Sequence, residues 1–272
     1  MKTLTLTITS VLLSALLMLT SCTKQNEIIT PASNADNLTE QFKLEAEQMS
    51  EEFTTNGQDN RLWWYLAILG AKDALGGALA YYSGADGELI VATAAVTSIC
   101  AASPTQTPDD FDWYNNINRG QYVENTASNP NNSFDFIGLG HNEFVINSTI
   151  QSVENQLSLY DGAAATFNGC SSKMISEKAL MNMVSGVVNA KTNSALLNEI
   201  AKSNLTKTNK WVLNFYFTKC FQAKNIAALQ QFSVNFENMI AANKKLSSNT
   251  KNGLLMTMAI NRYSVGMWSE IL

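Results

Sequence analysis

The sequence predicts an all-α protein, built as a single irregular helical bundle around a buried Gly/Ala-rich helical hairpin. Apolar residues recur at spacings of three and four from residue 133 almost to the C-terminus, and residues 61–84 are apolar nearly all round. Alternating patterns typical of strands are scarce, and "WVLNFYF" (211–217) is the one strand competitor. With 272 residues, 46% of them hydrophobic, the chain can bury a substantial core.

The first 21 residues have the pattern of a bacterial export signal. Lys2 gives a short basic start, residues 4–19 are mainly apolar, and Leu19, Thr20 and Ser21 precede Cys22. This end resembles a lipobox, which implies diacylglycerol on the Cys22 thiol, cleavage before Cys22 and acylation of the new amino terminus. An ordinary signal peptide followed by a chance cysteine is the alternative. The apolar run is shorter than the roughly 20 residues that a permanent span needs.

The expected destination is the bacterial cell envelope. Position 23 is Thr rather than Asp, which favours an outer-membrane lipoprotein and leaves the periplasmic and outer faces both open. Residues 22–35 are expected to form a lipidated tether, and residues 36–272 an all-helical domain. The predicted membrane contact is through the acyl chains on Cys22.

Charge argues against nucleic acid as a partner. Only 15% of residues are charged and the formal net charge is −5. Loss of Lys2 with the signal leaves 17 Lys and Arg against 23 Asp and Glu, a net charge of −6. A negative body without a concentrated basic stretch is unsuited to nucleic acid, so an envelope protein or a glycan is the expected kind of partner.

The helical domain is expected to open with an amphipathic helix and the hairpin. Asp36 or Asn37 is the predicted cap of the first helix, which should end near residues 56–57. Residues 61–84 and 87–103 then form the hairpin around "SGADG". Lys72 and Asp73 lie mid-helix, where each charge would cost roughly 3 kcal/mol in a bilayer, so a buried helix of a soluble domain is favoured over a pore-forming element.

A long loop at about 103–133 follows, with aromatic residues that either bind a ligand such as a sugar or pin the loop to the body. After it, helical spacing predicts further helices near 136–159, 172–190, 192–203, 207–221, 223–245 and 248–271.

The only histidine of the chain, His141, lies in "SFDFIGLGHNEFVI" (133–146). In a helix it shares an apolar face with Ile137 and Val145 and should point inward. Asp135 and Asn142 lie on an adjacent stripe with Gly138 between them. The weak binding candidates are therefore Asp135, Gly138, His141 and Asn142, and the alternative is a tight contact with another helix.

A hydrolase is a competing hypothesis, with His141 as base and Asp135 or Asn142 orienting its ring. Among the cysteines, Cys170 is the best nucleophile candidate because "NGCSS" can place it at a helix N-terminus. We favour a hydrogen-bonded structural histidine. Cys100, Cys170 and Cys220 can hold one disulfide or none. Since HExxH, GxSxG and phosphate-binding glycine patterns are absent, no metal and no cofactor are predicted.

"FDFIGLGHNEFV", after "GAKDALGGALA" and a lipobox, resembles a family of uncharacterised Bacteroidetes lipoproteins. That family pairs a small-residue Asp/Gly/Ala helix with a D-x-I-G-x-x-H-N motif, which falls here on Asp135, Ile137, Gly138, His141 and Asn142. The resemblance covers about a tenth of the chain and implies a location, not an activity.

The function predicted from the sequence is a non-enzymatic binding or envelope-organising role. The hydrolase and a toxin or immunity factor built on the hairpin are the alternatives.

Overall fold

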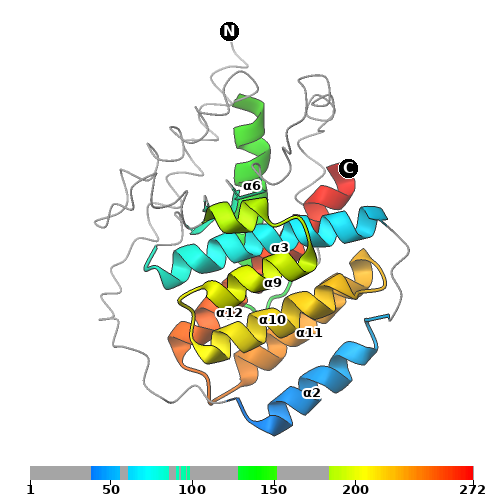
Figure 1. Cartoon of the computed structure of the whole chain (residues 1–272), viewed down its shortest axis with the longest axis vertical. Coiled ribbons are helices and arrows are strands. Elements are labelled where there is room, and N and C mark those ends of the chain that lie inside the picture. Colours follow the sequence, from blue (N-terminus) through cyan, green and yellow to red (C-terminus); the bar gives the residue numbers. More distant parts are fainter. Residues whose placement is uncertain are drawn as a thin grey trace. The chain divides into compact units, whose positions relative to one another are not determined.

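The computed structural model describes residues 38–55, 61–85, 90–91, 93–95, 97–98, 128–151 and 184–271, which belong to one compact unit, Asn34–Leu272. Within these ranges all regular elements are helices, which confirms the all-α prediction (Figure 1). The one β-type contact described there is an isolated bridge between Thr54 and Ala223. The signal peptide and tether, and residues 103–127 of the expected loop, lie outside the described residues.

Helix α2 (Glu40–Glu51) is shorter at both ends than the sequence predicts. Its cap is Thr39, not Asp36 or Asn37, because the Thr39 hydroxyl accepts a hydrogen bond from the Phe42 backbone N–H at 3.2 Å. The helix stops before residues 56–57 because the chain turns to pair with the loop after residue 221. There the Thr55 N–H donates to the Gln222 carbonyl at 2.8 Å, and the Lys224 N–H donates to the Phe53 carbonyl at 3.0 Å.

Helix α3 (Arg61–Tyr82) is the predicted apolar helix, and every residue from 66 to 78 is buried. It ends at Tyr82, and Gly84 follows in a turn, where its φ of 88° is reached at little steric cost. The described residues between 90 and 98 are helical and return along α3. A Cβ on Gly77 would come within 3.5 Å of Ala94 and Ile90, which shows how closely the two arms of the hairpin approach.

The C-terminal helices follow the predicted order. They are α6 (Asp135–Gln151), a short helix at 184–189, α9 (Asn193–Lys202), α10 (Lys207–Phe221), α11 (Ile226–Ala242) and α12 (Ser248–Ile271). The strand competitor at 211–217 lies inside α10, so the helical interpretation is correct. Thr192, Thr206 and Asn225 cap α9, α10 and α11 with their side chains. Residues 152–183, on which parts of two predicted helices fall, lie outside the described residues.

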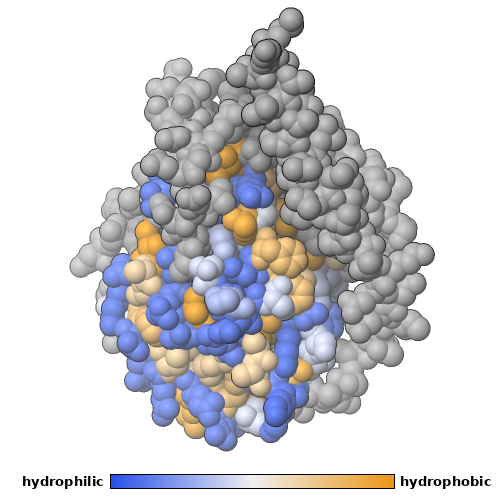
Figure 2. All heavy atoms as spheres, turned by 180° about the vertical axis from the view of Figure 1, so that it is seen from behind, coloured by the Kyte–Doolittle hydropathy of each residue, from blue (hydrophilic) through white to orange (hydrophobic). Residues whose placement is uncertain are grey.

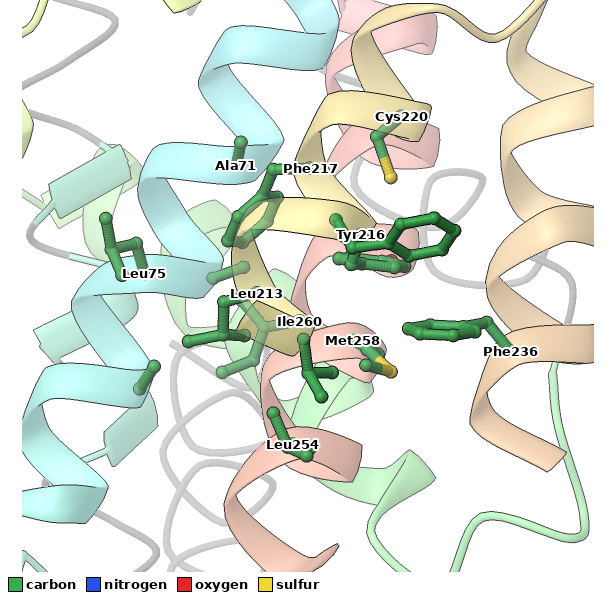
Figure 3. Close-up of a cluster of buried hydrophobic side chains, with 14 of the residues drawn as sticks. Ala71, Leu75, Leu213, Tyr216, Phe217, Cys220, Phe236, Leu254, Met258 and Ile260 are labelled. Atoms are coloured by element: carbon green, nitrogen blue, oxygen red, sulfur yellow. The ribbon is translucent and has the colours of Figure 1, made fainter. Parts of the chain in front are cut away.

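Helix α12 is the centre of the fold. Every residue from 253 to 268 is buried, and the helix packs against α3, α6, α10 and α11. Figure 3 shows side chains of α3, α10, α11 and α12 meeting in the core, among them Leu75, Leu213, Phe236 and Met258. Tyr216 stacks on Phe236 with ring centroids 5.9 Å apart, which joins α10 to α11.

Glycines allow α3 and α6 to approach α12 closely. A Cβ on Gly77 would lie 2.6 Å from the end of the Ile260 side chain. A Cβ on Gly138 would lie 2.6 Å from the Ala259 backbone carbonyl oxygen. Because a backbone atom cannot rotate away as a side chain can, Gly138 marks the tightest constraint on the α6–α12 distance.

The face opposite to that of Figure 1 carries mainly hydrophilic residues over its described lower part, with hydrophobic residues interspersed (Figure 2). Leu44 and Phe136 are the exposed large hydrophobic residues among those described, at 62% and 55% exposure. None of the described helices combines the length and apolar character needed to cross a membrane.

We expect Gly138→Ala to lower the free energy of unfolding by about 1–3 kcal/mol, because the added methyl group must push two helix backbones apart. The matched control is Gly186→Ala, where the new Cβ meets only the carboxylate end of the half-buried Glu199 side chain. That side chain can move, and alanine favours helix, so the control should be neutral or slightly stabilising. Chemical denaturation measures both. Equal effects of the two substitutions would contradict the close approach of α6 and α12.

Candidate functional site

Of the four candidate binding residues on α6, Asp135, Gly138 and Asn142 contact α12, and His141 points toward Asp73 of α3. Gly138, His141 and Asn142 are buried, and the Asp135 side chain is 19% exposed. Asn142 donates from Nδ2 to the Tyr263 backbone carbonyl at 2.9 Å. Cys22, Cys100 and Cys170 lie outside the described residues. The described candidates therefore belong to helix packing, and whether any of them binds a ligand stays a prediction.

Asp135 lies at the edge of a buried ionic cluster centred on Arg262 of α12. The guanidinium group pairs with Asp135 Oδ1 through Nη2 and with Glu237 Oε1 of α11 through Nε at 3.0 Å. The second Asp135 oxygen accepts a hydrogen bond from the Tyr263 hydroxyl at 2.8 Å. Arg262 and Glu237 have no exposed side-chain surface, so each charge depends on the other for the solvation that water would supply.

Two asparagines complete the solvation of Glu237. Asn129 and Asn132 donate from Nδ2 to Glu237 Oε2 at 2.8 and 3.0 Å. Their side-chain oxygens accept from the backbone N–H groups of Asn131 and Phe134, which fixes the turn before α6. The cluster thus holds the segment before α6 onto α11 and α12.

The electrostatics of this cluster favour the charged form of Arg262. Burial alone would lower the Arg262 pKa, but Glu237 and Asp135 raise it above its ordinary value. Burial and the Asp135 carboxylate raise the pKa of Tyr263 to about 12, so its hydroxyl remains a hydrogen-bond donor. Near neutral pH the Arg262 guanidinium group therefore stays charged and the Tyr263 hydroxyl stays protonated.

A second buried cluster surrounds Asp73 at the middle of α3. Its Oδ2 accepts hydrogen bonds from Ser98 Oγ at 2.7 Å, from Ser264 Oγ and from Trp268 Nε1 at 3.3 Å. His141 Nε2 lies 3.7 Å from the same oxygen. Asp73 and His141 have no exposed surface. The cluster therefore joins α3, α6, α12 and the helical residues around Ser98 in the interior.

Burial shifts both titratable groups of this second cluster toward their neutral forms. It raises the pKa of Asp73 to about 7, with its hydrogen bonds and Lys72 acting in the opposite direction. It lowers the pKa of His141 to about 4, against the hydrogen bond with Asn142. Lys72 is also buried and donates to the Val188 carbonyl at 2.8 Å, and burial lowers its pKa.

The described residues do not bring a cysteine to His141. Cys220 is buried on α10, where its Sγ accepts a hydrogen bond from Asn261 Nδ2 at 3.5 Å. Burial raises the pKa of its thiol far above the ordinary value, which disfavours a thiolate. The His141 ring contacts Asn142 Oδ1 through Nδ1 at 3.0 Å, whereas both Asp135 oxygens are engaged with Arg262 and Tyr263. Of the two residues considered for orienting the ring, Asn142 is the one in place.

A groove of about 500 Å³ runs between α2 and α10 at the surface. Along α10 it is lined by Trp211, Asn214, Thr218 and Gln222, at successive helical turns. Lys219 crosses it to pair with Glu47 of α2 at 2.6 Å. Unlike the buried clusters, this groove presents amide and hydroxyl groups that a ligand can reach.

Sequence reasoning did not find Glu237, Arg262, Ser264 or Trp268. The available signal was a polar residue inside an apolar helical stretch, as at Asp73 and Arg262. That signal indicates a buried partner but not which residue supplies it. Among the described residues, no group of three or more His, Cys, Asp or Glu is placed to hold a metal ion.

No protein-family model matches the sequence, and comparisons with curated proteins and with solved structures give no match.

We expect Arg262→Met to cost about 3–5 kcal/mol of unfolding free energy, because it leaves Glu237 buried without its counter-ion. The double variant Arg262→Met/Glu237→Gln removes the unpaired charge and should recover part of that loss. Urea denaturation of both variants measures the difference. A loss below about 1 kcal/mol in the single variant would show that the cluster does not hold α11 and α12 together.

Proposed function

We propose that this protein is a lipid-anchored protein of the bacterial cell envelope whose helical body binds a partner rather than catalysing a reaction. The observation that carries the anchor is the sequence Leu19-Thr20-Ser21-Cys22 at the end of a short apolar run. Acyl chains contribute about 0.8 kcal/mol per buried methylene, so several chains on one residue give durable attachment.

The outer membrane is the proposed destination, since Thr23 rather than Asp follows the lipidated cysteine. The membrane contact is the lipid itself, because a body with excess negative charge is not attracted to anionic headgroups. Residues 22–35 serve as the tether between lipid and body.

The non-enzymatic role is supported by the position of those described residues that could do chemistry. His141 has no exposed surface, and Cys220 is buried with a thiol that resists ionisation. Asp135 neutralises Arg262. A substrate would have to enter the packed α3–α6–α12 interior to meet the imidazole, so the geometry favours a structural role for His141.

The groove between α2 and α10 is the surface proposed for the partner, and its chemistry suits a glycan. Asn214, Thr218 and Gln222 form one stripe at intervals of four residues, with two exposed amides and a hydroxyl that both donate and accept. Sugar hydroxyls both donate and accept hydrogen bonds, so a glycan is matched by side chains that can do the same. The Glu47–Lys219 pair and Trp211 also line the groove.

Anchoring is tested by growing cells that express the full chain in labelled palmitate. The wild-type protein should carry label and begin at residue 22, and Cys22→Ser should carry none. Cys220→Ser is the matched control and should remain labelled, because Cys220 is buried in the body. A wild-type chain that is unlabelled, or that retains its starting methionine, would refute the anchor.

The groove is tested by cosedimentation of the full chain with envelope polysaccharide and with peptidoglycan. Asn214→Ala/Gln222→Ala should weaken retention at least tenfold if each lost hydrogen bond contributes about 1 kcal/mol. Gln231→Ala on the exposed face of α11 is the control and should bind as wild type does. Absence of wild-type binding, or equal binding by the groove variant, would count against a glycan at this site.

A further inference from the structure

The hydrogen bonds around Asn142 fix the protonation of the imidazole beside it. The Tyr263 backbone carbonyl can only accept, so the Asn142 amide nitrogen must face it, and the Asn142 oxygen must face His141. That oxygen also only accepts, and it lies 3.0 Å from His141 Nδ1. Nδ1 therefore carries a hydrogen, and in the neutral ring Nε2 is left with a bare lone pair.

The lone pair on Nε2 lies beside the Asp73 carboxyl group, whose Oδ2 is 3.7 Å away. Within the described part of the chain, His141 Nε2 and Asp73 Oδ1 are both buried without a hydrogen bond, whereas Asp73 Oδ2 accepts three. The carboxyl oxygen nearest to Nε2 is Oδ2, and without a proton between them Nε2 stays unsatisfied; an unsatisfied buried polar atom is costly. One proton between Oδ2 and Nε2 gives the ring nitrogen its missing partner. The 3.7 Å separation needs only about 1 Å of closure to become a hydrogen bond.

We propose that Asp73 and His141 share a single proton, carried mainly by Asp73 and donated to His141 Nε2, and that this pair makes the α3–α6–α12 contact insensitive to moderate acid. The proposal concerns the interior of the helical body and does not depend on the lipid anchor. It would suit a body exposed to a medium whose pH the cell does not control.

The groups around the pair are mostly uncharged. On α3 the neighbouring titratable residues are Lys72, which is buried and bonded to the Val188 carbonyl, and Tyr65, which remains protonated because burial and Asp73 raise its pKa. The helical residues at 97–98 supply Ser98, α6 supplies Asn142, and α12 supplies Ser264 and Trp268, none of which is charged. Lys72 and the donors to Asp73 Oδ2 favour the carboxylate, but the complete burial of the pair outweighs them, so the proton rests on oxygen.

The stability of the contact changes little with pH because the pKa values of Asp73 and His141 are shifted in opposite directions. Asp73 has a pKa raised from 3.8 to about 7, so its contribution to stability is full below 3.8 and is lost as the pH rises through about 7. His141 has a pKa lowered from 6.5 to about 4, so its contribution is full above 6.5 and is lost as the pH falls through about 4. Between about pH 4 and 6.5, folding moves one proton from imidazole to carboxyl with no net uptake.

The single histidine makes a direct test possible. The full chain, made without a polyhistidine tag and labelled with ¹⁵N-histidine, gives imidazole signals from His141 alone. From pH 5 to 9 we expect Nδ1 to stay protonated, while the Nε2 signal moves with a midpoint near 7 as Asp73 loses its proton. In Asp73→Asn the Nε2 signal should not titrate, because an amide donates at every pH, and the surface control Glu199→Gln should titrate as wild type.

Either of two results would overturn the proposal: both ring nitrogens titrating together near pH 6.5, or an Nε2 signal that does not move between pH 5 and 9. Should Asp73→Asn fail to fold, the wild-type titration decides alone.

Unfolding measured against pH gives an independent test. Relative to wild type, His141→Gln should lose stability as the pH rises from about 4 to 6.5, since only Asp73 then takes up a proton on folding. Asp73→Asn should gain stability over about pH 4 to 6.5, since only His141 then releases one. In each variant, the slope of the unfolding free energy against pH should differ from that of wild type by the amount expected for about one proton per molecule. A difference from wild type that stays constant across this range in both variants would contradict proton sharing.

Discussion

The structure depends on the complete burial of a helix that is not completely apolar. Residues 253–268 of α12 are buried on every side, yet they include Asn261, Arg262 and Ser264. An apolar helix in this position would accept many rotations and shifts, because dispersion contacts are not directional. Polar groups in the interior must find matching partners at hydrogen-bond distance. The neighbours of α12 are therefore fixed by those partners as well as by packing.

Each helix around α12 supplies one of these partners. Ser264 reaches Asp73 on α3, Arg262 reaches Asp135 on α6 and Glu237 on α11, and Asn261 reaches the Tyr216 hydroxyl on α10 at 2.9 Å. Glycines at the α3 and α6 contacts then allow the backbones to come close enough for these bonds to form. Small residues and buried polar groups act together: the former set the distance between helices and the latter set their register.

The sequence predicts the helices well because their signals are local. Threonine and asparagine caps and apolar spacing lie within one segment, so α9, α10 and α12 begin and end close to the predicted residues. The first helix shows the weakness of this reasoning, since several consecutive residues can cap and only the tertiary contact of residues 53–55 with 222–224 decides where the chain turns.

The chemistry of the buried residues was less predictable because their partners are distant in sequence. Periodicity places His141 and Asp135 near a helix interface, and the cost of charge in a helix interior marks Asp73 as unusual. Neither observation shows that Asp135 pairs with Arg262, more than 120 positions away. Neither shows that Asn142 is therefore the residue that orients the His141 ring. Such pairings depend on which helices become neighbours, and no spacing rule within one segment contains that information.

Native-state hydrogen exchange tests the central role of α12 most directly. If α12 is the element on which the other helices depend, its amides between residues 253 and 268 should exchange only through global unfolding, with protection equal to the full unfolding free energy. The amides of α2, which lies at the surface and exposes Leu44, should exchange through smaller openings. Exchange in α12 that is as fast as in α2, or that occurs while α3 and α11 stay protected, would contradict this account.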